Sequence, residues 1–254
     1  HTTAMDRAQM GGLDDVGVGV LYGLYDHKYD TIAMLMHAEH LEERFGVGPH
    51  TVSVPRLREA VGVNLETYPY LVKDEDFKKL VAILRLAVPY AGMILSTREE
   101  PSFRDEVIKL GISQVSAGSS TGVGGYMEAK QGTAGLSKEK PQFEVSDHRS
   151  PEEIIRGLCQ DGYVPSYCTA CYREGRTGDR FMRLAKSGQI HNICQPNSLL
   201  TFKEYLLDYA DEETRALGEE IIRKGLEDIP KEAARKATIS RLQRIENGER
   251  DLRF

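Results

Sequence analysis

Residues 91–117, AGMILSTREEPSFRDEVIKLGISQVSA, contain the pattern that decides the fold of the first half of the chain. An apolar run at 91–96 precedes a helical segment at 102–110, and a second apolar run follows at 112–117. Short apolar runs separated by a helix, without a hairpin turn, are typical of parallel strands joined by a crossover helix. The stretch therefore predicts one strand–helix–strand unit with a right-handed crossover.

The same alternation occurs upstream of this unit. Strands are predicted at 16–22 (VGVGVLY) and 50–54 (HTVSV), and helices at 29–45 and at 74–88, where Asp74 is the expected N-cap. Four such steps predict an α/β domain built on a parallel sheet. Four strands are too few to close an eight-stranded barrel, so half of a TIM-type barrel fits best. The alternative is a small, open, doubly wound sheet.

The alternation of apolar strands and helices ends at about residue 125. We assign residues 1–125 to the α/β domain, the Gly-rich polar stretch 126–143 to a linker, and residues 144–254 to a mainly helical domain. Ser150 and Glu153 predict a capping box at the start of a helix. Further helices are expected to follow, with the cysteines in the loops between them.

Composition limits the class of protein. The chain has 254 residues and a net charge of -6, so nucleic acid is not an expected partner. No apolar run approaches the roughly 20 residues of a membrane span, and no signal peptide is visible. The cysteines are not spaced like a disulfide framework, which favours the reducing cytoplasm. The chain starts at His1 inside a predicted helix, so we expect it to be part of a longer polypeptide.

Three cysteines, Cys168, Cys171 and Cys194, form a C-x2-C-x22-C pattern. Three thiolates suit an iron–sulfur cluster with one open iron. With His191 they also form a C-x2-C-x19-H-x2-C pattern, which suits structural zinc. On the cysteines alone, both interpretations stay open, and a pure electron-transfer cluster is a third. The remaining Cys159 lies on an apolar helix face and is expected in the core.

Several stretches resemble motifs of radical S-adenosylmethionine (SAM) enzymes. Residues 19–26 (GVLYGLYD) resemble the GxIxGxxE strand of that family, with Leu for Ile and Asp for Glu. Residues 96–99 (STRE), 116–118 (SAG) and 124–126 (GGY) are similar to its aromatic amino-acid lyase branch. With HTVSVPR at 50–56 and the cysteine spacing, essentially the whole chain resembles the tyrosine lyases that mature FeFe-hydrogenase.

This resemblance implies the second half of a radical SAM barrel followed by a helical domain that binds an auxiliary iron–sulfur cluster. It implies that a radical derived from SAM takes hydrogen from L-tyrosine, giving p-cresol and dehydroglycine. Dehydroglycine would then yield the CO and cyanide that are assembled on iron. The C-x3-C-x2-C motif for the SAM-cleaving 4Fe–4S cluster is absent from this chain. We expect it in an N-terminal half of the same enzyme, with hydrogenase maturation proteins as further partners.

The resemblance also implies roles for single residues. Arg98 and Ser116 would bind the substrate carboxylate, because a guanidinium fork matches a carboxylate. The alternatives are an ion pair of Arg98 with Glu99 or Glu100, and a packing role for Ser116. The SAM adenine would lie on the strand that contains Gly19, Leu21, Gly23 and Asp26.

His50 is the predicted ligand of a labile fifth iron beside the auxiliary cluster. It begins a strand, which places it at the end of the barrel opposite to the radical chemistry, and neutral imidazole is a good iron ligand. The alternative is that His50 caps the preceding Gly-Pro turn. His37, His40 and His191 are the competing histidines.

Overall fold

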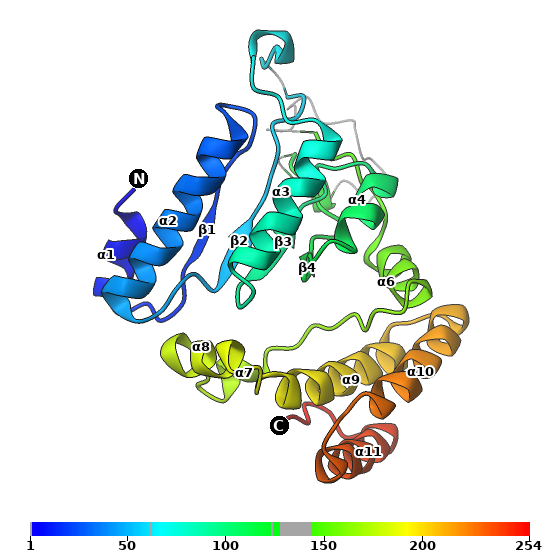
Figure 1. Cartoon of the computed structure of the whole chain (residues 1–254). Helices are drawn as coiled ribbons and strands as arrows, with labels where there is room; N and C mark the ends of the chain where they lie inside the picture. The colour runs from blue at the N-terminus through cyan, green and yellow to red at the C-terminus, as the bar shows by residue number, and fades with distance from the viewer. Residues whose placement is uncertain (1, 61, 123, 128–143) are drawn as a thin grey trace. The chain divides into compact units, whose positions relative to one another are not determined.

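The computed structural model describes residues 2–60, 62–122, 124–127 and 144–254 of the chain (Figure 1). These residues form two compact units, 1–149 and 150–254, which are described separately. The proposed linker lies almost wholly outside the described residues. Residues 144–149 belong to the first unit, because Ser146 and Asp147 donate backbone hydrogen bonds to the Thr97 carbonyl, each at 3.0 Å.

A four-stranded parallel sheet forms the centre of the first unit. Its order is β1 (Gly17–Gly19), β2 (Thr51–Ser53), β3 (Gly92–Leu95) and β4 (Gln114–Val115), which is also the order along the chain. The register pairs Val18 with Val52 and Val52 with Met93. The predicted parallel sheet is therefore confirmed. Its strands are shorter than the apolar runs from which they were predicted.

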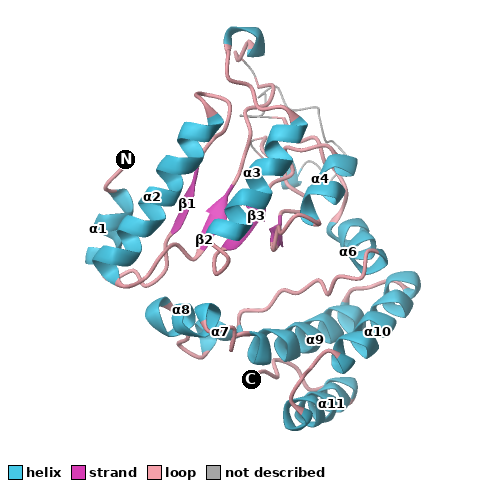
Figure 2. Ribbon diagram, viewed as in Figure 1, coloured by secondary structure: helices cyan, strands magenta, loops and turns pink. Residues whose placement is uncertain are grey.

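The connecting helices lie on one face of this sheet (Figure 2). They are α2 (His27–Phe45), α3 (Asp74–Ala87) and α4 (Pro101–Ile108). Residues on the helix side, such as Val18, Val52 and Met93, are buried, whereas residues on the other face are small or polar, such as Gly19 and Ser53. A doubly wound sheet has helices on both faces. The one-sided cover is the arrangement of a barrel half.

The helix boundaries require one correction. Lys73, not Asp74, occupies the N-cap of α3, and Asp74 is its first helical residue. Asp74 turns instead to Arg56, with which it forms an ion pair at 2.8 Å. The first unit also contains α1 (Ala4–Met10) and the short 3-10 helix η1 (Leu65–Thr67).

Within the residues that the structure describes, the second unit contains helices and loops but no strand. The predicted capping box is confirmed at the start of its first helix, where Ser150 and Glu153 bond to each other's backbone N–H groups. Its helices are α6 (Pro151–Gln160), α7 (Ala170–Arg173), α8 (Gly178–Lys186), α9 (His191–Asp208), α10 (Glu212–Glu227) and α11 (Glu232–Glu246).

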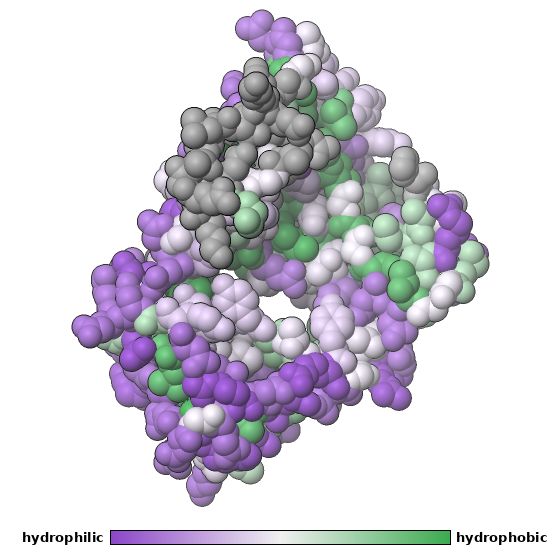
Figure 3. All heavy atoms as spheres, turned by 180° about the vertical axis from the view of Figure 1, so that it is seen from behind, coloured by the Kyte–Doolittle hydropathy of each residue, from purple (hydrophilic) through white to green (hydrophobic). Residues whose placement is uncertain are grey.

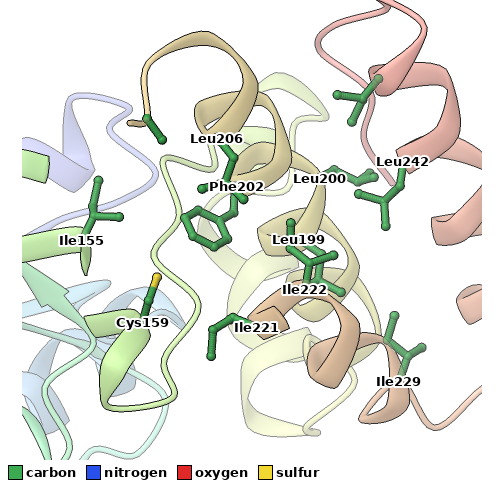
Figure 4. Close-up of a cluster of buried hydrophobic side chains, with 12 residues drawn as sticks. Ile155, Cys159, Leu199, Leu200, Phe202, Leu206, Ile221, Ile222, Ile229 and Leu242 are labelled. Carbon is green, nitrogen blue, oxygen red and sulfur yellow. The ribbon is translucent and has the colours of Figure 1, made fainter. Parts of the chain in front are cut away.

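The core of this helical unit surrounds α9 (Figure 4). Leu199, Leu206 and Ile222 are almost completely buried there, and the Cys159 side chain of α6 joins them, as predicted. The surface of the helical unit is mainly hydrophilic in the view of Figure 3. None of the described helices is long and apolar enough to cross a bilayer.

Candidate functional site

The predicted substrate residues lie at the carboxyl edge of two neighbouring strands. Arg98 follows β3, and Ser116 follows β4 directly. The Ser116 N–H donates to the Leu95 carbonyl at 3.1 Å, so the end of β4 is fastened to the end of β3. The structure therefore brings both residues to the edge where barrel enzymes place their active sites.

Arg98 is half-buried. Burial lowers the pKa of its guanidinium from the ordinary arginine value, although the Glu99 carboxylate acts in the opposite direction. Arg98 still remains a cation, since arginine does not lose its proton in proteins. The two oxygens of Glu99 accept hydrogen bonds from Arg56 and Arg58.

Arg56 is a central residue that sequence analysis left without a role. It is buried against the neighbouring rings of Phe77 and Phe103, whose centroids lie 4.6 and 4.8 Å from its guanidinium carbon. It pairs with Glu99 and Asp74 on the two sides. The sequence offered one indication of this role, because Arg56 follows a proline directly after a predicted strand. Only the fold shows that its ion-pair partner is Glu99, far along the chain.

A second buried ion pair fastens the loops that carry the predicted substrate residues. Arg104 pairs with Asp147, and both side chains are inaccessible to solvent. The same guanidinium donates to the Ser116 carbonyl at 2.6 Å. Because the backbone of Asp147 also binds the Thr97 carbonyl, these two residues hold the ends of β3 and β4 together. Sequence analysis missed this pair because its members are 43 residues apart.

Of the predicted SAM strand, only Gly19 lies in the edge strand β1, and the residues after it form the loop that leads to α2, so the predicted strand is too long. Gly19 faces Ser53 so closely that an added Cβ would lie 3.0 Å from the serine side chain. Gly23 has a φ of 113°, which disfavours any other residue. Asp26 accepts from the Lys28 N–H at 2.9 Å and caps α2. Leu21 is half-buried in this segment.

His50 lies at the opposite end of the sheet from Arg98, as predicted. Its N–H donates to the Val16 carbonyl at 2.8 Å, and its carbonyl accepts from the Gly92 N–H at 2.9 Å. Its Nδ1 lies 3.5 Å from Asp15 Oδ1. Asp15 was not predicted, and a neighbouring carboxylate is the usual partner that orients a ligand histidine.

The competing histidines of α2 lie close together. His40 Nε2 is 2.8 Å from Asp6 Oδ1, and Arg44 shares that carboxylate at 2.7 Å. The ring of His37 lies 6.4 Å from that of His40. His40 and Arg44 thus both bind the Asp6 carboxylate and join α2 to α1.

Two of the three predicted ligand cysteines lie on helices, although loops were predicted. Cys168 precedes α7, Cys171 lies within α7, and Cys194 lies in the first turn of α9. The expectation that the cysteines lie in loops is therefore wrong for Cys171 and Cys194. Cys168 and Cys194 are exposed, whereas Cys159 is buried.

The thiols influence one another. Although both residues are exposed at the surface, the protein atoms around their sulfur atoms exclude water and raise the pKa of Cys168 and of Cys194, the latter to about 11. The neighbouring Cys171 raises both further, and the Arg176 guanidinium lowers both. The Arg176 N–H donates to the Cys171 carbonyl at 2.8 Å, so Arg176 lies directly beside α7. Burial alone raises the pKa of Cys159 to about 11, as expected in a core.

The donor set suits an iron–sulfur cluster by its chemistry, because cysteine thiolates are the usual ligands of such clusters. Within the described residues, no three His, Cys, Asp or Glu side chains are gathered closely enough for a single metal ion. His191 is exposed and lies three residues before Cys194 on α9, so both are on the same helix face. This leaves His191 available to the zinc alternative.

Comparison with known proteins agrees with this architecture. Residues 53–164 match the Biotin and Thiamin Synthesis associated domain. The 2-iminoacetate synthases of Escherichia coli (strain K12) and Salmonella typhimurium (strain LT2) are 36% and 35% identical over 162 residues, which is 63% of this chain and 40% of theirs.

Solved structures are similar over a larger part of the chain. A crystal structure of HydG, a maturase of the FeFe-hydrogenase, matches with a TM-score of 0.93 and 66% identity, covering 100% of this chain and 54% of that one. HydG from Carboxydothermus hydrogenoformans matches with a TM-score of 0.74 and 40% identity, covering 94% and 50%. The chain thus spans about half the length of these proteins. Over that length it is similar to HydG, with half of a radical SAM barrel followed by a helical domain.

Proposed function

We propose that this chain is part of a radical SAM tyrosine lyase that supplies CO and cyanide, assembled on iron, for the FeFe-hydrogenase active site. The observation that carries the proposal is the match to HydG along the whole chain at 66% identity. The name of the Escherichia coli relative supports the first product, because 2-iminoacetate is dehydroglycine. The other product of tyrosine cleavage is p-cresol. The N-terminal half of the enzyme, with its SAM-cleaving cluster, and hydrogenase maturation proteins are the proposed partners, in the cytoplasm.

The substrate carboxylate is assigned to Arg98 and Ser116. When bound, SAM and its cluster supply the radical that takes hydrogen from the substrate. The residues of this chain would hold the substrate in a fixed orientation during that step, because fixed orientation lowers the reaction barrier. The half-buried Arg98 is suited to the task, since a charge-assisted bond is stronger away from water. The SAM adenine is assigned to the segment that contains Gly19, Leu21, Gly23 and Asp26, from the end of β1 to the start of α2.

The auxiliary cluster is assigned to Cys168, Cys171 and Cys194, and a labile iron to His50. The three thiolates leave one cluster position for exogenous chemistry, which a closed four-ligand site would not. Asp15 beside His50 would orient the imidazole for iron. The iron that receives CO and cyanide is cargo of the reaction.

The test uses an enzyme of full length that contains this chain, reconstituted anaerobically with iron and sulfide. We expect p-cresol from tyrosine and SAM, and loss of acid-labile sulfide from this part of the enzyme in Cys168→Ala. Arg98→Lys should raise the KM for tyrosine because the bidentate fork is lost. One zinc and no sulfide in the anaerobic protein would contradict the proposal.

A zinc-stabilised interaction module without catalysis is the second candidate. The observation in its favour is that His191 and Cys194 share one face of α9. This candidate requires His191 in the metal shell. It is excluded when His191→Ala keeps the full metal content of the unaltered chain.

A further inference from the structure

The last residues of the chain, 250–254, are bound along α9, and we name them the C-terminal strap. The Phe254 N–H donates to Asn197 Oδ1 at 2.9 Å, and the Asn197 amide donates to the Phe254 carbonyl at 3.4 Å. Farther along the helix, the Asp251 N–H donates to Glu204 Oε1 at 2.6 Å. Asn197 is buried, so its pairing with Phe254 fixes the end of the strap firmly.

The same strap is bound to the segment that carries Cys171. Arg173 of α7 pairs with Asp251, and Arg176 donates to the Phe254 carbonyl at 2.6 Å. On α9, Asn197 lies three residues after Cys194, about one helical turn away. The strap therefore joins the helix of one cysteine to the helix of another.

A chain of hydrogen bonds ties the remaining cysteine to the same helix. The Cys168 N–H donates to Ser166 Oγ at 3.2 Å, and Ser166 bonds to Thr201 Oγ1 at 2.8 Å. Thr201 in turn donates to the Asn197 carbonyl at 3.0 Å. Asn197 is thus the point on α9 where the supports of Cys168 and of Arg176 meet.

Arg176 is the charged residue that connects the helices of two cysteines in this arrangement. Its N–H donates to the Cys171 carbonyl at 2.8 Å. Its guanidinium donates to the Phe254 carbonyl, which also accepts from Asn197, three residues after Cys194 on α9. Its Nε is buried and has no hydrogen-bond partner among the described residues. A buried donor without a partner costs free energy unless a ligand accepts from it. An iron–sulfur cluster held by three thiolates is an anion whose sulfurs accept hydrogen bonds.

We propose that Arg176 stabilises the group bound by the three cysteines, with a fixed positive charge and a donated hydrogen bond, and that Asn197 and Phe254 are its positioning residues. The proposal rests on the proposed function, since it takes that group to be an anionic iron–sulfur cluster. Removing the charge of Arg176 disfavours the reduced, more negative cluster, so its reduction potential falls. Removing the Asn197 amide releases Phe254 and, with it, the guanidinium.

The experiment uses the whole chain, reconstituted anaerobically with iron and sulfide. It compares Arg176→Gln, Arg176→Lys and Asn197→Ala with the unaltered chain. The measurements are iron and sulfide per chain, the rate of iron loss to a ferrous chelator, and the reduction potential followed by electron paramagnetic resonance. The control is Arg180→Gln, which removes the same charge from an exposed residue nearby.

We expect Arg176→Gln to lose iron about tenfold faster and to have a lower potential, because a charge-assisted hydrogen bond is lost. Arg176→Lys should restore most of the potential, and Arg180→Gln should match the unaltered chain. Asn197→Ala should shift the potential in the same direction as Arg176→Gln. Arg176→Gln with unchanged potential and iron loss would overturn this inference alone. Zinc without sulfide in the unaltered chain would overturn the proposed function together with it.

Discussion

Among single residues, Asp147 has the largest predicted effect on stability. Its carboxylate is completely buried and pairs with the equally buried Arg104. Asp147→Ala leaves the Arg104 charge buried without its partner, which costs about 3–5 kcal/mol. Urea unfolding of the first unit measures the loss. The matched control is Asp105→Ala, which removes the half-exposed second partner of Arg149 and should cost less than about 1 kcal/mol. Equal losses in the two variants would contradict the role of burial.

The same carboxyl group predicts how stability depends on pH. Burial raises the pKa of Asp147, but the hydrogen bonds from Arg149 and Arg104 outweigh burial and hold it below the ordinary value. A carboxyl group with a depressed folded pKa contributes stability above its unfolded pKa of about 3.9. That contribution is lost as the pH falls from about 4 through the folded pKa.

The measurement compares urea unfolding of the first unit at pH 5 and pH 3. Asp147→Asn cannot titrate, so the unaltered chain should lose more stability over this interval than the variant. Identical losses would show that Asp147 titrates alike in the folded and unfolded chain.

Among the elements, the packing of α10 on α9 depends on a close approach at one glycine. A Cβ added at Gly218 would lie 2.5 Å from the terminal carbons of Leu206. Gly218→Ala must displace that buried side chain and should cost about 1–3 kcal/mol. Gly157 in α6 is the control, because nothing lies within 4 Å of its added Cβ. Gly157→Ala should stabilise the helical unit by about 0.5–1 kcal/mol. Thermal unfolding of both variants gives opposite shifts if the packing is as described.

In the whole molecule, the two compact units predict a local response to loss of the cluster. The three cysteine ligands of the proposed cluster lie in the helical unit, and each unit has its own core. Removing iron and sulfide should therefore raise amide hydrogen exchange in α7 and in the first turns of α9. Exchange in α3 and α4 should stay unchanged. Equal deprotection in both units would mean that the chain unfolds as one cooperative body.

Local patterns were sufficient for most elements. The apolar runs that became β2 and β3 and the Ser150–Glu153 box depend on neighbours in sequence, so they could be predicted. The strand ends were less predictable, because an apolar run continues past the last paired residue. The N-cap of α3 was misplaced because Asp74 is drawn to Arg56, a partner from another loop.

For the candidate sites, the sequence by itself determined which residue types are present and their spacing. It placed Arg98 and Ser116 after strands and His50 before one, because strand direction follows from parallel topology. Only the tertiary structure decided which buried charges meet, since the partners in Arg56–Glu99 and Arg104–Asp147 are each 43 residues apart. The pairing of Phe254 with Asn197 was also decided by the tertiary structure, because these residues are 57 positions apart. Such pairs depend on distance in space and exclusion of water, and neither can be computed from spacing along the chain.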